Sequence, residues 1–179
     1  FCFVFIFSKK MEICNVHYVI IPTGDYHNSE YVSDFFRVRE FFTGFTGSNG
    51  TLVVTREGAL LWTDGRYFVQ AERELKGTGI ELYRMLQEGV PTIKEFLTRQ
   101  MQEGQILGFD GRVVPTATGM ELEKALAEKG VTIQYQWDLA GEVWVDRPEL
   151  PAGEVWVVPE EVAGVPLADK LISVRKAMK

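Results

Sequence analysis

Side chains that could act as nucleophile, base or metal ligand are sparse in this sequence. Its two histidines, His17 and His27, both lie near the start, and neither belongs to an H-E-x-x-H motif or accompanies a Cys-x-x-Cys pair. His17 adjoins an expected strand, so we interpret it as a hydrogen-bonded structural histidine. His27 has Asp25 and Glu30 nearby, and one imidazole with two carboxylates supplies too few ligands to predict a metal site. We therefore expect no catalytic residue and no metal site in this chain.

Three glycines, Gly44, Gly47 and Gly50, recur at a spacing of three residues. A phosphate-binding loop follows a strand and opens a helix, whereas this loop follows an expected helix and opens an expected strand. Ser48 also fails the nucleophile-elbow pattern G-x-S-x-G, because Thr46 stands where the first glycine is required. We interpret the three glycines as turn residues.

Asp64 and Arg66 form the polar pair of greatest interest. Arg66, at the start of a helix beyond a strand, could project toward a neighbouring domain or subunit and bind a peptide carboxylate or an acidic side chain. The alternative, which we favour, is that Asp64 caps the helix and Arg66 makes a structural ion pair, since such pairs are common and contribute little alone. Trp62 and Tyr67 flank this turn, and we expect them in the core or at an interface. With His27, these four residues are the candidates for contact with substrate or with another subunit.

Elements that would position these residues follow from the apolar patterns. Residues Thr51–Thr55 alternate between two faces and Ala59–Thr63 is apolar almost throughout, so both are expected strands of an antiparallel hairpin. Gly58 stands in the connecting loop, where a positive φ is usually needed. Four further runs predict strands, at residues 16–21, 80–85, 106–109 and 131–135.

Helical spacing and capping patterns predict helices between these strands. The first expected helix is capped by Ser29, ends at Gly44 and carries an apolar stripe of Tyr31, Phe35, Val38 and Phe42. The second is capped by Asp64 and carries Phe68, Ala71 and Leu75, and the third begins with a capping box of Thr92 and Glu95. Two more are expected at residues 121–129 and, as a short helix, from Asp138 through Trp144. Six strands separated mostly by helices predict an α/β fold with a mixed six-stranded sheet flanked by helices. The hairpin supplies its one obvious antiparallel pair.

From Arg147 the pattern changes, because four prolines surround an isolated extended run at residues 155–158. This indicates a domain boundary. Beyond it, apolar residues at helical spacing predict an amphipathic helix with nothing after it to pack on. They are Leu167, Leu171, Val174 and Met178.

Composition excludes several classes of function. The 179 residues suit one domain plus a little more, at about 100 to 200 residues per domain. A net charge of −6 argues mildly against nucleic acid or an anionic membrane as partner. Cys2 and Cys14 make no disulfide framework, which indicates a reducing compartment such as the cytoplasm. The apolar run at residues 1–7 is far shorter than the roughly 20 residues that span a bilayer, and it lacks the features of a secretory signal.

Four segments together resemble the amino-terminal domain of the Xaa-Pro aminopeptidase (aminopeptidase P) family. They read DYHNSEY at residues 25–31, FTGSNGT at 45–51, WTDGRYF at 62–68 and DRP at 146–148 followed by Pro151. The resemblance implies a creatinase-type, ribonuclease-H-like domain at residues 16–160. Residues 1–15 before this domain form an atypical segment, because residues 1–7 depart from the amphipathic helix that the family has there. After the domain, residues 161–179 are expected to form a linker and the first helix of a truncated second domain.

In that family the catalytic centre is a dinuclear metal site, usually manganese, in a carboxy-terminal domain. The resemblance therefore implies a non-catalytic amino-terminal domain of a cytosolic enzyme that removes the residue preceding proline from peptides. Its implied partners are its own catalytic domain, a peptide substrate and further copies in a homo-oligomer. The alternative is a non-enzymatic creatinase-like module that binds protein partners, because a fold alone does not decide function.

Overall fold

Six strands form one mixed sheet in the computed structural model, which describes residues 2–136 and 138–179 and the side chains of residues 5–136 and 138–179. The order across the sheet is β4-β3-β2-β1-β5-β6. The strands are β1 Tyr18–Pro22, β2 Thr51–Thr55, β3 Ala59–Thr63, β4 Ile80–Arg84, β5 Ile106–Phe109 and β6 Thr132–Gln134. The predicted fold class, a six-stranded mixed sheet flanked by helices, is confirmed.

Strand pairing adds one feature that the sequence did not indicate. β2 and β3 form the predicted antiparallel hairpin, with Thr51 opposite Trp62. β1 is also antiparallel to β2, with Tyr18 opposite Thr55. The β1–β5, β3–β4 and β5–β6 pairs are parallel. The sheet thus has two antiparallel pairs, and the second joins strands separated by almost thirty residues of chain.

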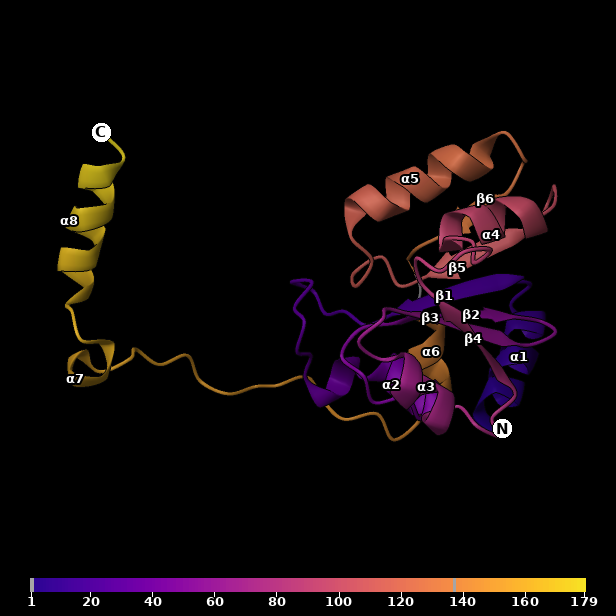
Figure 1. Ribbon diagram of the computed structural model, residues 1–179, viewed down its shortest axis with the longest axis horizontal. Helices are drawn as coiled ribbons and strands as arrows, with labels where there is room; N and C mark the ends of the chain where they lie inside the picture. The colour runs from indigo at the N-terminus through magenta and orange to yellow at the C-terminus, as the bar shows by residue number, and fades with distance from the viewer. Residues whose placement is uncertain (1, 137) are drawn as a thin grey trace.

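Helices cover both faces of the sheet. On one side lie α1 Cys2–Ile13, α2 Val38–Thr43, α3 Phe68–Glu74 and α6 Leu139–Val143, and on the other lie α4 Ile93–Gln100 and α5 Thr116–Ala127 (Figure 1). The alternation in β2 separates two cores: Leu52 and Val54 join the cluster under the first group of helices, and Val53 joins the cluster under the second. Burial of apolar area on both faces stabilises the sheet.

The amino-terminal segment packs as part of this body. Phe7 and Met11 of α1 are fully buried in the first cluster. Lys10 pairs with Glu142 of α6 at 2.7 Å. Phe1 lies outside the described residues. Within residues 2–7, where the sequence departs from the family pattern, the chain is helical.

The expected helix at residues 31–43 is shorter than predicted. A 3-10 turn, η1 Asp34–Phe36, is followed by α2, which begins only at Val38, and Tyr31 is 83% exposed. Ser29 does not cap a helix, because its backbone N–H and that of His27 both donate to Asp25 Oδ1 at 2.8 Å. Local side-chain hydrogen bonds of this kind compete with helix formation. The assignment of Tyr31 to an apolar core stripe is therefore wrong.

Two predicted caps are confirmed. Thr92 and Glu95 form a full capping box at the start of α4. Asp138 accepts a hydrogen bond from the Gly141 N–H at the start of α6. In contrast, the residue that precedes α3 is Tyr67, without a side-chain cap, so the prediction that Asp64 caps this helix is wrong.

Two smaller predictions also differ from the structure. α5 begins at Thr116, five residues before the predicted start. Gly58 has no positive φ. Instead, the Thr55 hydroxyl accepts hydrogen bonds from the N–H groups of Glu57 and Gly58, both at 3.1 Å, and holds the hairpin loop.

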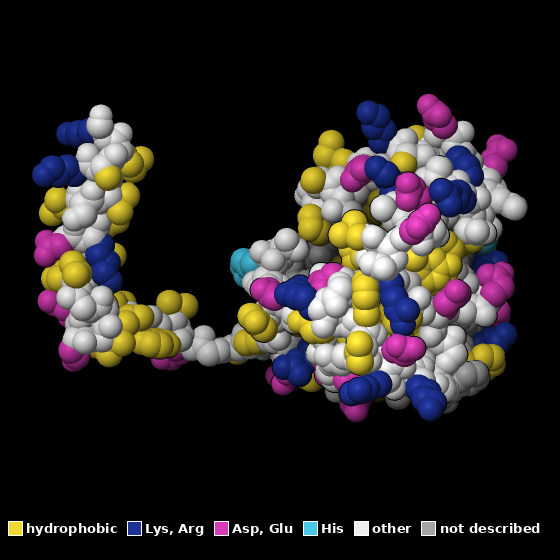
Figure 2. Space-filling model, viewed as in Figure 1, with side chains coloured by type: hydrophobic (Ala, Val, Ile, Leu, Met, Phe, Trp, Pro, Cys, Tyr) yellow, Lys and Arg dark blue, Asp and Glu magenta, His cyan; other side chains and the backbone are white. Residues whose placement is uncertain are grey.

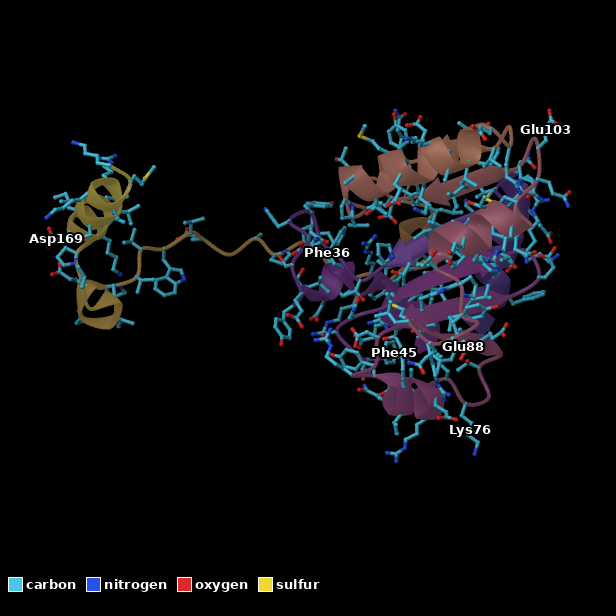
Figure 3. All side chains as sticks on the ribbon, turned by 45° about the horizontal axis from the view of Figure 1, so that its top comes forward. Phe36, Phe45, Lys76, Glu88, Glu103 and Asp169 are labelled. Carbon is cyan, nitrogen blue, oxygen red and sulfur yellow. The ribbon has the colours of Figure 1, made fainter. Side chains whose placement is uncertain are left out.

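Beyond Arg147 the chain leaves the sheet and its helices. Residues 148–162 are all exposed, and α7 Glu160–Ala163 and α8 Leu167–Ala177 contain no buried residue. Figure 1 shows both helices away from the sheet, and Figure 2 shows hydrophobic side chains gathered along this part of the chain. Phe36 lies on the side of the sheet body that faces this segment, with Asp169 of α8 far from it (Figure 3). Among residues 2–136 and 138–179, no helix combines the length and hydropathy needed to cross a membrane.

Candidate functional site

Three of the four motif segments meet at one end of the sheet. The β2–β3 hairpin brings the loop before β2 next to the turn after β3, and the loop at residues 25–31 lies against both. We call the polar side chains that meet there the motif surface. They are Glu30, Ser48, Asn49, Asp64, Arg66 and Tyr67.

Hydrogen bonds join these three segments to one another. Ser48 Oγ lies 2.7 Å from the Tyr67 hydroxyl oxygen and 3.4 Å from Glu30 Oε1. Asn49 Nδ2 donates to Asp64 Oδ2 at 2.6 Å. Each contact crosses from one motif to another, so the motif surface exists only in the folded chain.

Asp64 and Arg66 form a tight ion pair at the centre of this surface. Arg66 Nε donates to Asp64 Oδ1 at 3.0 Å, Arg66 Nη2 donates to Oδ2 at 2.9 Å, and the Arg66 backbone N–H also donates to Oδ1. These bonds hold the pKa of Asp64 well below its usual range and raise that of Arg66. The structural ion pair that we favoured is present. Arg66 remains 58% exposed and reaches Glu30 only at 3.4 Å.

Tyr67 is half-buried, and its ring lies 5.9 Å from that of Phe45. Trp62, in contrast, points away from the motif surface into the core cluster under α4 and α5. It is 1% exposed, and its Nε1 donates to the Pro91 carbonyl oxygen at 2.8 Å. Of the two aromatic residues that flank the turn, only Tyr67 therefore belongs to the motif surface.

The two histidines stay separate from the motif surface and from each other. His27 is exposed in the loop at residues 25–31. His17 Nδ1 accepts a hydrogen bond from the Ile106 backbone N–H at 3.2 Å, as expected for a structural histidine. Burial lowers the pKa of His17, and the charge of Arg56 adds to this effect.

The sequence did not indicate a role for Arg39, a buried residue that holds the loop before β2 in place. Arg39 is 4% exposed, and it donates from Nη1 to the Phe45 carbonyl at 2.7 Å and from Nη2 to the Gly47 carbonyl at 2.5 Å. Nε donates to the Thr23 hydroxyl at 2.8 Å. Burial lowers the pKa of Arg39 to about 10. The sequence did contain an indication that Arg39 is buried, because Arg39 is spaced four residues from both Phe35 and Thr43, on the inner side of the expected helix.

The glycines of this loop have different roles from the predicted one. Gly44 has φ +69° and ends α2, which agrees with a turn residue. Gly47 has no positive φ, but a Cβ there would lie 2.3 Å from the Phe45 ring and 2.9 Å from Tyr67 Cδ1. A Cβ at Gly50 would lie 3.2 Å from the Trp62 carbonyl oxygen. Gly47 and Gly50 are therefore close-approach residues, and the interpretation of all three as turn residues is wrong for these two.

A cavity of about 310 Å³ lies beside the motif surface. Its lining includes two acidic and two basic side chains, Glu30, Glu40, Arg37 and Arg39, with Ser48 at one side. Ser48 has a tyrosine and a carboxylate as its neighbours and no histidine within hydrogen-bond distance. In the part of the chain that the structure describes, no cluster of three or more His, Cys, Asp or Glu side chains could hold a metal ion. The geometry suits polar contact with a neighbouring peptide or protein surface.

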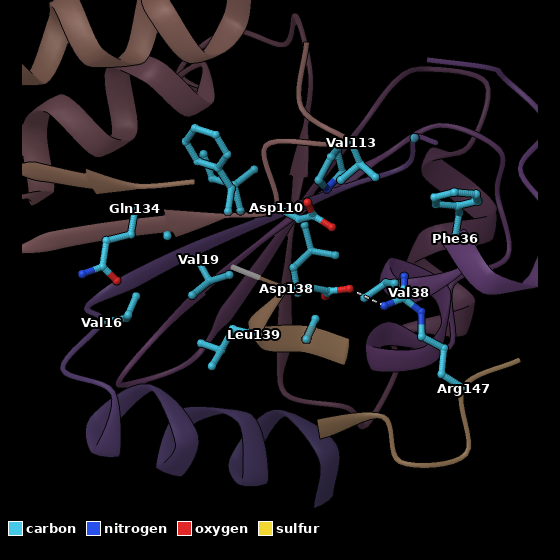
Figure 4. A pocket seen from close by; sticks show the side chains of 17 residues that line it. Val16, Val19, Phe36, Val38, Asp110, Val113, Gln134, Asp138, Leu139 and Arg147 are labelled. Carbon is cyan, nitrogen blue, oxygen red and sulfur yellow. Dashed lines mark hydrogen bonds and ion pairs between the residues drawn. The ribbon is translucent and has the colours of Figure 1, made fainter. Parts of the chain in front are cut away.

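The fourth motif lies elsewhere, beside a small cavity of about 40 Å³ near the end of the domain body (Figure 4). Arg147 donates from Nη1 to Asp138 Oδ2 at 2.5 Å and from Nε to the Phe35 carbonyl at 2.7 Å. The structure thus brings together three motifs at one surface and uses the fourth to attach the start of the C-terminal segment.

Comparison with known proteins gives consistent matches. The family model of the creatinase/prolidase N-terminal domain matches residues 9–136. A probable Xaa-Pro aminopeptidase P of Talaromyces marneffei is 40% identical over 96% of this chain and 26% of its own length. Aminopeptidase P2 of Arabidopsis thaliana is 38% identical over 87% of this chain and 22% of its own length. The chain therefore spans about a quarter of the length of these relatives.

Solved structures agree with the sequence matches. The crystal structure of an X-prolyl aminopeptidase from Caenorhabditis elegans, described as a cytosolic enzyme with a di-nuclear active site, superposes with a TM-score of 0.79 at 34% identity. It covers 91% of this chain and 27% of the enzyme. The N-terminal domain of the cytoplasmic peptidase PepQ from Mycobacterium tuberculosis matches with a TM-score of 0.56 at 21% identity and covers 79% of this chain and 98% of its own, which shows the shared fold.

Proposed function

Because this chain belongs to the creatinase/prolidase N-terminal domain family, we propose that it is the non-catalytic amino-terminal domain of a metal-dependent Xaa-Pro aminopeptidase. Such an enzyme removes the amino-terminal residue that precedes proline from a peptide. The role of the domain in it is to shape access to the active site and to form subunit contacts.

The observation that carries this proposal is the extent of the match to aminopeptidases. Relatives at 38–40% identity align with 87–96% of this chain, yet the matched part is only 22–26% of their own length. We place the catalytic chemistry in a downstream domain that holds a dinuclear metal, which we propose to be manganese. The description of the Caenorhabditis elegans enzyme as di-nuclear and cytosolic supports a metal pair and a cytoplasmic location.

The motif surface is the part of this domain that we assign to contact with the catalytic domain or its peptide. It presents a fixed cation, Arg66, and an exposed carboxylate, Glu30, and the exposed ring of Tyr31 follows Glu30 in the same loop. Asp64 and Asn49 are held in place by hydrogen bonds within this domain, so their positions do not depend on a bound peptide or protein. A surface arranged in advance in this way loses little side-chain entropy on contact. Tyr67 and His27 lie on the same two loops and complete the candidate set.

The first test is the activity of the purified chain of 179 residues. With manganese added, we expect no hydrolysis of an Xaa-Pro peptide, while a full-length enzyme assayed in parallel hydrolyses it. Metal-dependent, saturable turnover by this chain would contradict the proposal.

The second test concerns the motif surface in a full-length enzyme that contains this chain. Arg66→Ala should raise KM for an Xaa-Pro peptide or change the oligomeric state. Arg73→Ala, on the exposed part of α3, serves as the matched control. Unchanged kinetics and unchanged assembly in Arg66→Ala would reject the contact role and leave only a structural role for Arg66.

The reading frame beyond Lys179 decides between the peptidase and a protein-binding module. A downstream domain with two aspartates, one histidine and two glutamates in the metal-binding arrangement of the family supports the peptidase. Its loss would support a creatinase-like module that binds protein partners.

A further inference from the structure

Arg147 attaches the start of the C-terminal segment to the domain. Its side chain is only 10% exposed, it makes the two hydrogen bonds to Asp138 and Phe35 described above, and its guanidinium carbon lies 3.7 Å from the centroid of the Phe35 ring. Figure 4 shows Arg147 and Asp138 facing each other at the edge of the cavity. An arginine that is stacked and hydrogen-bonded through two nitrogens is held in one geometry, because the planar group must satisfy all these contacts together.

Asp138 is held in place independently of Arg147. Its Oδ1 accepts a hydrogen bond from the Gly141 N–H at 2.8 Å, and its Oδ2 also accepts one from Arg112 Nη2 at 3.2 Å. The next residue, Leu139, is 4% exposed in the first core cluster. The acceptor of the Arg147 bond is therefore a fixed part of the domain.

Arg147 stands where packing on the domain ends. Trp144, three residues earlier, still stacks on Phe41 with ring centroids 4.3 Å apart. Residues 148–162 are all exposed. In the described part of the chain, Arg147 is the last residue with a side-chain hydrogen bond to the sheet body. It thus fixes the point from which the C-terminal segment departs.

Ring contacts connect this attachment to the motif surface. The Phe35 ring, on which Arg147 stacks, meets Phe36 edge-on at 4.9 Å, and Phe36 meets Tyr26 edge-on at 4.8 Å. Tyr26 belongs to the loop at residues 25–31, which carries Glu30. Packed side chains therefore lead without interruption from the start of the C-terminal segment to one of the three motif loops.

We propose that Arg147 is a positioning residue that sets the direction in which the chain leaves this domain. By doing so it places the downstream catalytic domain relative to the motif surface. This second step rests on the proposed function, because it requires a catalytic domain after this one. The first step concerns only contacts within this chain.

Amide hydrogen exchange of the 179-residue chain tests the first step. The N–H groups of Trp144 and Arg147 are bonded to the carbonyls of Ala140 and Trp144 at 3.0 and 3.3 Å. In Arg147→Lys we expect both to exchange at least tenfold faster, with exchange in β2 unchanged. Lysine keeps the aliphatic stem but cannot reproduce the planar, two-sided contact, so the variant should remain folded. The control is Arg37→Lys, whose side chain is 50% exposed and pairs with Asp34. Unchanged exchange in Arg147→Lys would overturn the attachment.

Kinetics of a full-length enzyme test the second step. We expect Arg147→Lys to raise KM for an Xaa-Pro peptide at least fivefold while kcat stays within twofold and metal content is unchanged. A fall in kcat alone, at unchanged KM, means loss of folded enzyme and overturns the positioning role. If the full-length protein has no peptidase activity even without substitution, the proposed function fails and takes the second step with it. The exchange experiment still decides the attachment in that case.

Discussion

Replacing Arg39 with alanine should cost the domain a large part of its stability. Arg39 is 4% exposed and is the donor to the carbonyl groups of Phe45 and Gly47, at 2.7 and 2.5 Å. Without the guanidinium, both carbonyl groups lose their partner inside the loop that carries Ser48. We therefore expect a lower free energy of unfolding and a looser motif surface.

The magnitude follows from the acceptors left behind. A buried acceptor without its donor costs about 1–3 kcal/mol, so two carbonyl groups give roughly 2–6 kcal/mol. The Thr23 hydroxyl adds little, because it still donates to the Gly50 carbonyl at 3.1 Å. Part of the loss is offset, since burying the charged guanidinium is itself costly, as its pKa lowered to about 10 indicates. We expect a net loss of about 2–4 kcal/mol.

Urea unfolding at pH 7, followed by tryptophan fluorescence and by circular dichroism, measures this loss through linear extrapolation. Arg39→Lys should lose less, because an ammonium group can still donate to one or both carbonyls. The control is Arg37→Ala, two residues away, whose exposed side chain pairs with Asp34 and Glu40 at 3.1 and 3.8 Å. Exposed pairs contribute less than about 1 kcal/mol. An Arg39→Ala variant within 1 kcal/mol of the unsubstituted chain, at equal m-value, would refute the reasoning.

Three further changes test individual features of the fold. Gly47→Ala should lower the free energy of unfolding by about 1–3 kcal/mol through overpacking against the Phe45 ring, measured by urea unfolding, whereas an unchanged midpoint would contradict the close approach. Asp64→Asn should flatten the acid side of the stability curve. A carboxyl whose folded pKa is lowered contributes its full stability above its unfolded pKa of about 3.9 and loses it as the pH falls through the lowered folded pKa. In thermal melts, the difference between the variant and the unsubstituted chain should begin to narrow near about pH 4 and close only well below about pH 3, and a difference that does not change with pH would contradict this role of the carboxylate. Thr92→Ala should cost about 0.5–2 kcal/mol in the same urea assay because the capping box with Glu95 is lost, and a loss no larger than that of Thr98→Ala within α4 would argue against it.

Predictions from the sequence succeeded where the deciding interactions are local. The hairpin follows from two adjacent β-prone runs joined by three residues, and the Thr92 and Glu95 box from a pattern four residues long. The opposite facing of Leu52 and Val53 follows from the two-residue period of a strand. Helix boundaries were less well predicted. The Asp25 carboxylate accepts hydrogen bonds from the backbone N–H groups of His27 and Ser29, which keeps this segment before α2 from forming a helix. The spacing of apolar residues gives no sign of such a competing hydrogen bond.

For the candidate site, the sequence identified the motifs but only part of their arrangement. It placed Asp64, Arg66 and Tyr67 on one turn and proposed the ion pair that the structure contains. It grouped Trp62 with them, although neighbouring strand residues face opposite sides and Trp62 points into the other core. Arg39 was missed because the hydrophobic pattern treats every arginine as a surface residue.

The sequence by itself determined the family, the six strands and the helix caps at Thr92 and Asp138, since each motif, strand or cap is a pattern of residues within a few positions of one another. Only the tertiary structure decided that β1 pairs with β2, that Gly47 must lack a side chain to admit Phe45 and Tyr67, and that Arg147 reaches Phe35. These contacts join residues that are distant along the chain or that approach only after packing. Their energies depend on distances and burial that no local pattern specifies.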